Sequence, residues 1–209
     1  MFLRAVPVVL LAALAGNASA AITGISSNLD VTWLNSPPAS VAPGALVGSL
    51  PFVFDEQQNV FVNNLFVNVI NNPSVTPGTS FPGLLTAPVD SHFFHIDTQS
   101  GFTGSGTVFF SGRILGVIYR DNELDSTDIM LGNNTTLYPT GFNNRGWSPL
   151  APGGMFSINN NAFHFSFFNP AGVFGFDQIR ILTEIVPSPG TASLLALGGL
   201  VAVGRRRKS

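Results

Sequence analysis

The chain has 209 residues, of which 22 are glycine, 15 are proline and none is cysteine, and its formal net charge is −2. Between residues 21 and 190 lie four arginines and all eleven acidic residues, so this segment has a net charge of −7. It lacks the basic stripe that nucleic-acid binding needs, which excludes that class of function, and the lack of cysteine excludes a disulfide framework.

The first twenty residues have the pattern of a secretory signal peptide. Arg4 supplies the positive charge, residues 5–15 form an uninterrupted apolar stretch, and Ala18 and Ala20 provide the small side chains of a cleavage site. The apolar stretch is too short for a membrane-spanning helix, which needs roughly 20 residues. We therefore expect export of the protein, with Ala21 as the first residue of the mature chain.

Residues 21–185 show strand patterns throughout and no convincing helix. Short strands separated by glycine, proline, asparagine and aspartate are typical of a single all-β domain, and we predict a β-sandwich or jelly roll. Phe163, Phe165 and Phe167 share one face of a predicted strand, which indicates core packing. Further strands are expected at residues 92–97, 107–111, 113–120 and 178–185.

Two of the three histidines, His92 and His95, lie in one short segment with Asp90 and Asp97. Side chains alternate between the two faces of a strand, so the two imidazoles diverge and cannot share a metal ion unless the strand breaks. Only His164 remains as a third imidazole. We expect a strand whose polar residues meet solvent or loop backbone, rather than a zinc site.

The densest group of acidic side chains lies in residues 121–128, directly after a predicted strand. Ca²⁺ prefers several closely spaced oxygen ligands, so this segment is the best candidate for an ion site. It does not fit an EF-hand loop, because Ser126 stands where the turn glycine belongs and Gly132 where the bidentate glutamate belongs. A solvated acidic loop is the alternative interpretation. The candidate calcium ligands are Asp121, Glu123, Asp125 and Asp128.

Motifs of catalysis are not evident in the sequence. It contains neither a G-x-S-x-G elbow nor a cysteine nucleophile, and we expect no enzymatic activity. Trp33 and Trp147 are the side chains best suited to stack on sugar rings. Trp33 lies in a strand-like stretch and is expected in the core, whereas Trp147 lies in a predicted loop. Exposure of Trp147 in a groove would favour glycan binding over a purely structural role.

The C-terminal segment, residues 186–209, combines three features in a fixed order. It begins with prolines and a glycine, which stop a strand or helix, continues with an apolar stretch at residues 192–203, and ends in a basic cluster. As a helix the apolar stretch spans about 18 Å, against roughly 30 Å of hydrocarbon, which favours transient anchoring in the membrane. The residues that would hold its far end in the cytoplasm are Arg205, Arg206, Arg207 and Lys208.

This order of features resembles the PEP-CTERM sorting signal. The resemblance covers the tail alone, and Ser188 stands where that family has a glutamate. It implies sorting of an exported protein to the cell surface or extracellular matrix of bacteria that make exopolysaccharide, after transient anchoring in the membrane. It also implies processing by exosortase, a transpeptidase-like membrane enzyme. The residues that match the sorting motif are Val186, Pro187, Ser188, Pro189 and Gly190.

Two functions from different classes remain open. The first is a structural or adhesive protein of the surface or matrix, with exopolysaccharide as a possible partner and no turnover of substrate. The second is a secreted carbohydrate-binding module or glycan-active enzyme on the same β-sandwich, because sandwiches host both. The acidic composition and the lack of catalytic motifs favour the first.

Overall fold

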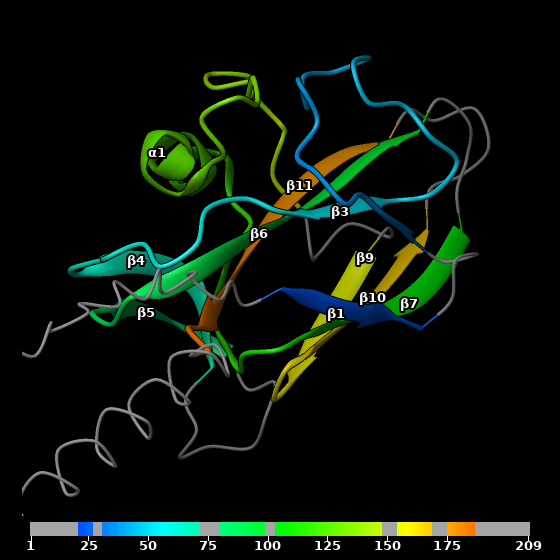
Figure 1. Cartoon of the computed structure of the whole chain (residues 1–209). Helices are drawn as coiled ribbons and strands as arrows, with labels where there is room; N and C mark the ends of the chain where they lie inside the picture. Colours follow the sequence, from blue (N-terminus) through cyan, green and yellow to red (C-terminus); the bar gives the residue numbers. More distant parts are fainter. Residues whose placement is uncertain are drawn as a thin grey trace, which may run out of the picture. The chain divides into compact units, whose positions relative to one another are not determined.

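The structure is a computed structural model that describes residues 21–26, 31–71, 80–98, 103–147, 154–168 and 175–186. The described residues belong to one contact unit, Ser19–Val186, and are mostly β, with two sheets and one helix (Figure 1). The helix, α1, is Asp121–Leu131. The strands are β1 (Ile22–Ile25), β2 (Thr32–Trp33), β3 (Phe52–Asp55), β4 (Leu65–Asn71), β5 (Ser80–Leu85), β6 (Val89–Thr98), β7 (Thr103–Phe110), β8 (Ile114–Ile118), β9 (Gly154–Asn159), β10 (Ala162–Phe168) and β11 (Gly175–Glu184).

The smaller sheet has four strands in the order β1-β7-β10-β9, and the larger has seven in the order β2-β3-β6-β11-β8-β4-β5. All the pairings are antiparallel except that of β2 with β3. The two longest strands, β6 and β11, pair along their whole length, from Thr98 with Gly175 to Val89 with Glu184. They form the centre of the larger sheet, and the functional residues described below depend on them for position.

The two sheets face each other across an apolar core rich in phenylalanine. Phe163, Phe165 and Phe167 of β10 point into this core, which confirms the prediction from their spacing. Phe94 of β6 meets them from the larger sheet, with its ring centroid 4.9 Å from that of Phe165 and 5.7 Å from that of Phe163. Aromatic side chains bury large apolar areas, so this core supplies the stability that disulfides supply in many secreted domains.

The sequence predicted that the polar residues of β6 meet solvent or loop backbone, and the structure shows the second: Asp97 accepts the N–H of Gly44 at 2.7 Å, and Nε2 of His95 lies 3.2 Å from the carbonyl oxygen of Leu46. All ten residues of β6 are buried. Phe94 faces the core between the sheets, whereas Phe93 faces the opposite side and belongs to a second apolar cluster. The strand is buried on both faces because a further layer covers the larger sheet on the side away from the smaller one.

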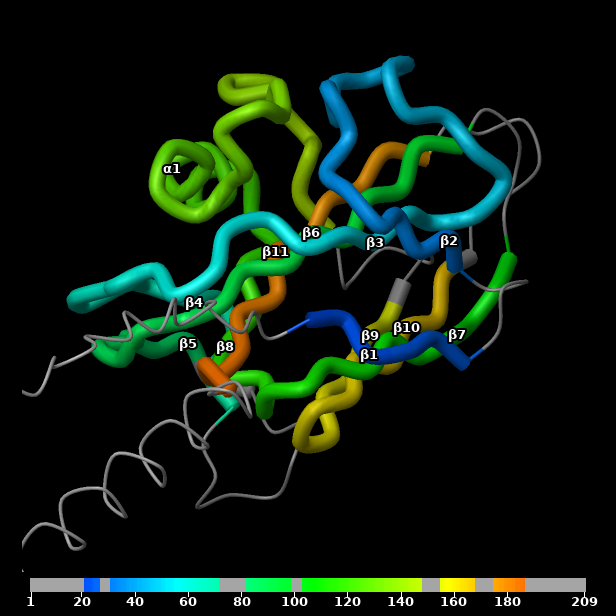
Figure 2. Tube along the Cα trace, viewed as in Figure 1, coloured from blue at the N-terminus to red at the C-terminus, as the bar shows by residue number. Residues whose placement is uncertain are grey.

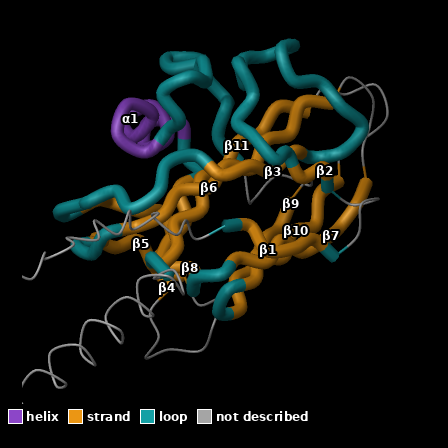
Figure 3. Tube along the Cα trace, viewed as in Figure 1, coloured by secondary structure: helices purple, strands orange, loops and turns teal. Residues whose placement is uncertain are grey.

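That further layer consists of α1 and loops, which Figure 3 shows over the larger sheet. Leu124 and Leu131 of α1 pack in the second cluster with Phe93 of β6 and Leu182 of β11. The prediction that the domain contains no helix is therefore wrong. The helix and the loops cover a sheet face that would otherwise be in contact with water, and Phe93 and His95 of β6 are therefore buried there.

Several predictions concern parts of the chain beyond the described residues. The signal peptide, residues 1–20, and the tail from Pro187 onward both lie there, as does the predicted tail helix. Within the described ranges, no helix combines the length and the apolar character required to cross a membrane. The sorting signals therefore stay predictions from the sequence.

Candidate functional site

The acidic segment forms helix α1 rather than the loop that the sequence predicted. Acidic side chains in its first turn, Asp121 and Glu123, favour the N-terminal end of a helix. The residues that α1 buries have the spacing of one helix face, but two of the four are polar, so the apolar pattern that normally predicts a helix is incomplete. These buried residues are Leu124, Thr127, Asp128 and Leu131.

The carboxylates of α1 bind the loop that follows the helix. Asp121 accepts a hydrogen bond from the backbone N–H of Asn144, and Asp125 accepts one from the N–H of Gly141, each at 2.8 Å. Among the described residues, no group of three or more His, Cys, Asp and Glu side chains is placed to hold a metal ion. Asp121 and Asp125 are therefore already bound to backbone groups of the loop. The calcium site stays a prediction, tested by melting the domain in Ca²⁺ and in EDTA, at Asp121, Glu123, Asp125 and Asp128.

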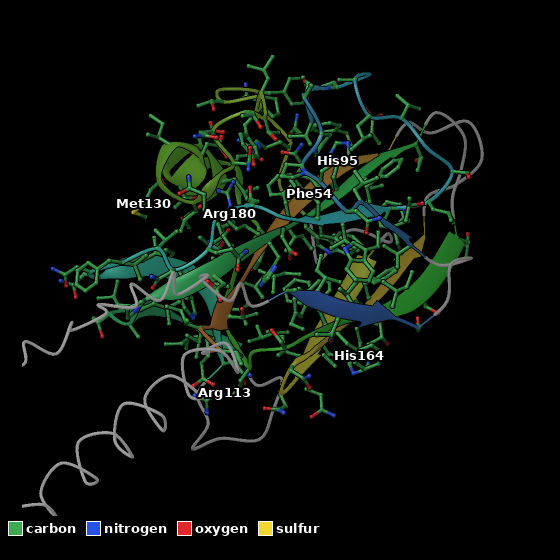
Figure 4. The ribbon with its side chains drawn as sticks, viewed as in Figure 1. Phe54, His95, Arg113, Met130, His164 and Arg180 are labelled. Atoms are coloured by element: carbon green, nitrogen blue, oxygen red, sulfur yellow. The ribbon has the colours of Figure 1, made fainter. Side chains whose placement is uncertain are left out.

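Arg180 of β11 is fully buried on the α1 side of the larger sheet (Figure 4). Its guanidinium donates to both carboxylate oxygens of Glu56, at 2.7 and 2.9 Å, and to Asp128 at 3.1 Å. It also lies 5.2 Å from the ring centroid of Phe93. Burial acts to lower the pKa of Arg180, but the carboxylates of Glu56 and Asp128 outweigh it and hold this pKa above its ordinary value. Arg180 therefore stays charged and ties α1 to β11.

A second buried guanidinium, that of Arg145, extends this network. It donates to Asp125 at 2.7 Å, to both oxygens of Asp128 at 2.6 and 3.1 Å, and to the side-chain oxygen of Gln178 at 2.8 Å. Asp128 is thus shared by two arginines, and the charges that α1 buries are compensated by the sheet and the loop. We refer to the following five residues as the ionic cluster: Glu56, Asp125, Asp128, Arg145 and Arg180.

The three histidines do not meet, which agrees with the predicted divergence of His92 and His95. His95 lies on the α1 side, where its Nε2 is 3.2 Å from the carbonyl oxygen of Leu46. Burial lowers the pKa of His95 to about 4, the Leu46 carbonyl opposes this effect, and the charge of Arg145 adds to it. His92 lies on the face toward the smaller sheet, and Figure 4 shows His164 on that smaller sheet, away from His95.

His92 belongs to a row of carboxylate, imidazole and hydroxyl groups. Its Nδ1 lies 2.6 Å from Oδ1 of Asp55, and its Nε2 lies 3.0 Å from the hydroxyl of Thr183. The order of groups matches that of an activated hydroxyl nucleophile with its base. However, His92 and Thr183 are both fully buried, so a substrate cannot reach the hydroxyl. Asp55 also accepts the N–H of Ile22 at 3.2 Å, so the row links β1 and β3 to the centre of the larger sheet.

The burial of the two tryptophans is the reverse of the prediction, which placed Trp33 in the core and Trp147 in a loop. Trp147 is 3% exposed and packs in the core between the sheets, with its ring centroid 5.6 Å from that of Phe167. Trp33 is 37% exposed, although Val31 beside it is fully buried. Trp33 lines a pocket of about 460 Å³ between β1 and β2. Trp33, and not Trp147, is therefore the tryptophan that a ligand can contact.

Sequence motifs do not indicate the arginines of the ionic cluster, although a signal for one of them is present in the sequence. Arg180 interrupts the apolar run that begins at Ile179 and continues through Ile181 and Leu182. A cation within a buried strand needs an anionic partner, but sequence does not identify which of eleven acids supplies it.

Comparison of the chain with protein-family models, curated proteins and solved structures finds no match. Its function is therefore inferred from its own residues.

Proposed function

We propose that the chain is an exported, non-catalytic protein of the cell surface or extracellular matrix, with a structural or adhesive role on a β-sandwich scaffold. The observation that carries this proposal is the ionic cluster. Arg145 and Arg180 are bound to carboxylates inside the domain, and the hydroxyl of Thr183 beside His92 is buried. These buried groups stabilise the scaffold, so any partner would contact the exposed side chains of the domain.

Delivery to the surface is the second part of this proposal. The signal peptide would be removed before Ala21, and the tail of residues 186–209 would anchor the chain transiently in the membrane. An exosortase-type enzyme would then process the proline motif around Ser188, which places the domain on the surface or in an exopolysaccharide matrix. The fixed order of motif, apolar stretch and basic cluster supports this route.

Deletion of residues 186–209 tests the delivery. Pro187 and Pro189 lack amide donors and end strand pairing, so the deletion should leave the melting temperature of the domain within error. It should also move the protein from the cell surface to another fraction, measured by surface labelling and cell fractionation in a host that makes exosortase. An unfolded product, or an unchanged location, would contradict the proposal.

Substitutions in the basic cluster separate its charge from the rest of the tail. Changing Arg205, Arg206, Arg207 and Lys208 to serine should weaken retention, because the charge that opposes translocation is lost. Arg113→Ser, which removes one arginine from the domain, is the matched control and should leave retention unchanged. Mass spectrometry of the exported chain should find Ala21 at its N-terminus, and a mature chain that still begins at Met1 would exclude the signal peptide.

A carbohydrate-binding module is the second candidate, and one observation favours it. Trp33 is partly exposed and lines a pocket at the edge of the domain. Pockets that combine an aromatic wall with a few polar groups are the usual form of small-ligand sites. The same scaffold would then both occupy the matrix and bind its polysaccharide.

A further inference from the structure

The pocket beside Trp33 lies between the edge strands of the two sheets. β1 is an edge of the smaller sheet and β2 is an edge of the larger one. Figure 2 shows both strands at the same side of the domain, with the end of β1 below β2. The pocket has a volume of about 460 Å³, within the range of roughly 300–1,000 Å³ that small-molecule sites occupy. It is lined by Gly24, Ile25, Val31, Thr32 and Trp33.

The described lining combines an aromatic wall with an apolar floor. Trp33 supplies the wall, and its indole remains 37% exposed. Val31 is fully buried and belongs to the core between the sheets, and Ile25 packs against that core. The floor is therefore held by the rigid interior of the domain, and the exposed part of Trp33 offers a flat apolar surface to a ligand.

Backbone polar groups lie next to this aromatic surface. The pairing of β2 with β3 uses the N–H of Thr32, which donates to Pro51 at 2.8 Å, and the N–H of Leu34, which donates to Val53 at 2.9 Å. In a parallel pair, alternate residues direct their backbone groups to opposite sides of the strand. The N–H and C=O of Trp33 therefore point along the outer edge of the larger sheet, where they can bind hydroxyl groups of a ligand.

The charge of the N-terminal part of the chain, which supplies the lining of the pocket, selects against anionic ligands. Between Arg4 and Arg113 the sequence contains no lysine or arginine, whereas it contains five acidic residues in that interval. The described lining of the pocket carries no charge. An acidic polymer would find no cation there to neutralise it and would be repelled by the net charge of the domain. An uncharged ligand would meet neither penalty.

We propose that this pocket binds one uncharged hexopyranose ring of a polysaccharide. The apolar C–H face of the sugar stacks on the indole of Trp33, and its hydroxyls bind the edge backbone of Trp33 and the side chain of Thr32. This inference rests on the second candidate function above, and it names the site and the class of glycan. Tyr and Trp are suited to this role because they combine a large apolar surface with a polar edge.

Titration calorimetry of the purified, exported full chain with neutral oligosaccharides tests the inference. The probes are cellohexaose, maltohexaose and mannohexaose, with hexagalacturonate as the anionic comparison. At least one neutral probe should bind, and hexagalacturonate should bind more weakly. Trp33→Ala should weaken binding by about two- to tenfold, since contact with an aromatic ring contributes on that scale. Trp33→Tyr should retain most of the affinity.

Phe61→Ala is the matched control, because Phe61 is an exposed aromatic residue, 74% accessible, at the other end of β6. It should bind the sugar as the unchanged protein does. Trp33 and Trp147 are the only tryptophans, and Trp147 is buried, so a fluorescence change on binding should come from Trp33 and disappear in Trp33→Tyr. Equal melting temperatures of all variants would show that the loss of binding is local.

Three results would overturn the inference: no binding of any neutral probe, unchanged affinity in Trp33→Ala, or preference for hexagalacturonate. None of these results would affect the deletion of residues 186–209, which tests surface delivery by location alone. Loss of glycan binding with correct surface sorting would therefore reject this pocket and leave the proposed surface function standing. Glycan binding without surface sorting would do the reverse.

Discussion

The two faces of the seven-stranded sheet are both buried, but by different chemistry. Toward the smaller sheet, Phe94 and Ile181 pack in an apolar cluster, and the polar side chains of Asp55, His92 and Thr183 on this face bind one another. Toward α1, Phe93 and Leu182 share their surface with Arg180, which pairs with Phe93 across β6 and β11 and whose guanidinium donates to two carboxylates. One sheet thus has a mainly apolar face with a single polar row at His92, and a face that mixes apolar packing with two buried guanidinium groups and their carboxylates.

The two faces should respond differently to substitution. Apolar contacts are non-directional and scale with buried area, so a smaller apolar side chain loses part of the stabilisation. A buried ion pair depends on both partners, and removal of one leaves the other charged without compensation. The face toward α1 should therefore be more sensitive than the other face to the loss of a single side chain.

Arg180→Met should have the largest effect. Methionine fills a similar volume, but it leaves the buried carboxylate of Glu56 without its bidentate partner and removes one of the two arginines from Asp128. Loss of one partner from a buried ion pair costs about 3–5 kcal/mol. Urea unfolding should show this decrease in the free energy of unfolding.

Arg180→Lys controls for charge in this test. Lysine keeps the positive charge but cannot reproduce the bidentate geometry toward Glu56, so its cost should be intermediate. If Arg180→Met costs less than 1 kcal/mol, as is typical of an exposed pair, the ionic cluster is not a determinant of stability, and the contrast between the two faces fails. Should Arg180→Met not fold at all, Arg180→Lys still measures the geometric part.

A fall in pH from 7 to about 4.5 should destabilise the domain through His95. In the folded state the pKa of His95 is lowered from 6.5 to about 4, so between these values the unfolded chain binds the proton and the folded chain does not. Stability that is present above pH 6.5 is therefore lost as the pH falls toward 4, and His95 contributes about 2–3 kcal/mol of this loss.

His95→Gln isolates this contribution, because glutamine keeps a donor and an acceptor for Leu46 and Gln178 but does not titrate. Urea unfolding at pH 7 and pH 4.5 should give a smaller difference for His95→Gln than for the unchanged protein. Equal differences would show that the pKa of His95 is not lowered in the folded state. Burial raises the pKa of Asp97, and the hydrogen bond from the N–H of Gly44 partly offsets this rise. Asp97 therefore adds stability as the pH falls, but it does so equally in both proteins because both contain it.

Phe94→Leu should have a smaller effect, about 1–2 kcal/mol, since the core between the sheets loses part of one ring and its contacts with Phe163 and Phe165. Phe93→Leu, one residue earlier and on the other face, is the matched comparison. It should cost more, because the ring of Phe93 also lies under the guanidinium of Arg180. Thermal unfolding of both variants measures the difference. Equal losses of stability would show that the contact between Arg180 and the ring of Phe93 contributes nothing measurable.

The sequence predicts the apolar face better than the mixed one. Phe163, Phe165 and Phe167 alternate with polar residues, and the period of two is sufficient to identify both the strand and its buried side. Helix α1 has the right spacing of buried residues, but Thr127 and Asp128 occupy two of those positions. A buried aspartate needs a cationic partner nearby. The residue pattern of the helix does not show that Arg145 and Arg180, which are distant in the sequence, lie within hydrogen-bond distance of Asp128.

The same limit applies to the two tryptophans. Their local sequences suggest a strand for Trp33 and a loop for Trp147, and both suggestions are reasonable by propensity. Exposure, however, depends on tertiary position: β2 lies at the edge of the larger sheet, whereas Trp147 follows a loop that turns into the core between the sheets. Sheet order is a non-local property, so a strand at the edge and a strand at the centre look alike in the sequence.

Arg113→Ala should have the smallest effect and marks the lower end of the comparison. Arg113 pairs with Glu184, but their side chains are 30% and 45% exposed, so solvent and salt screen the pair. The backbone holds the two residues independently, because the N–H of Glu184 donates to the carbonyl of Arg113 at 2.8 Å. The free energy of unfolding should fall by less than about 1 kcal/mol, and by less still in 0.5 M salt. A loss as large as that of Arg180→Met would show that burial does not distinguish the arginines, and the contrast between the ionic cluster and the surface would have to be abandoned.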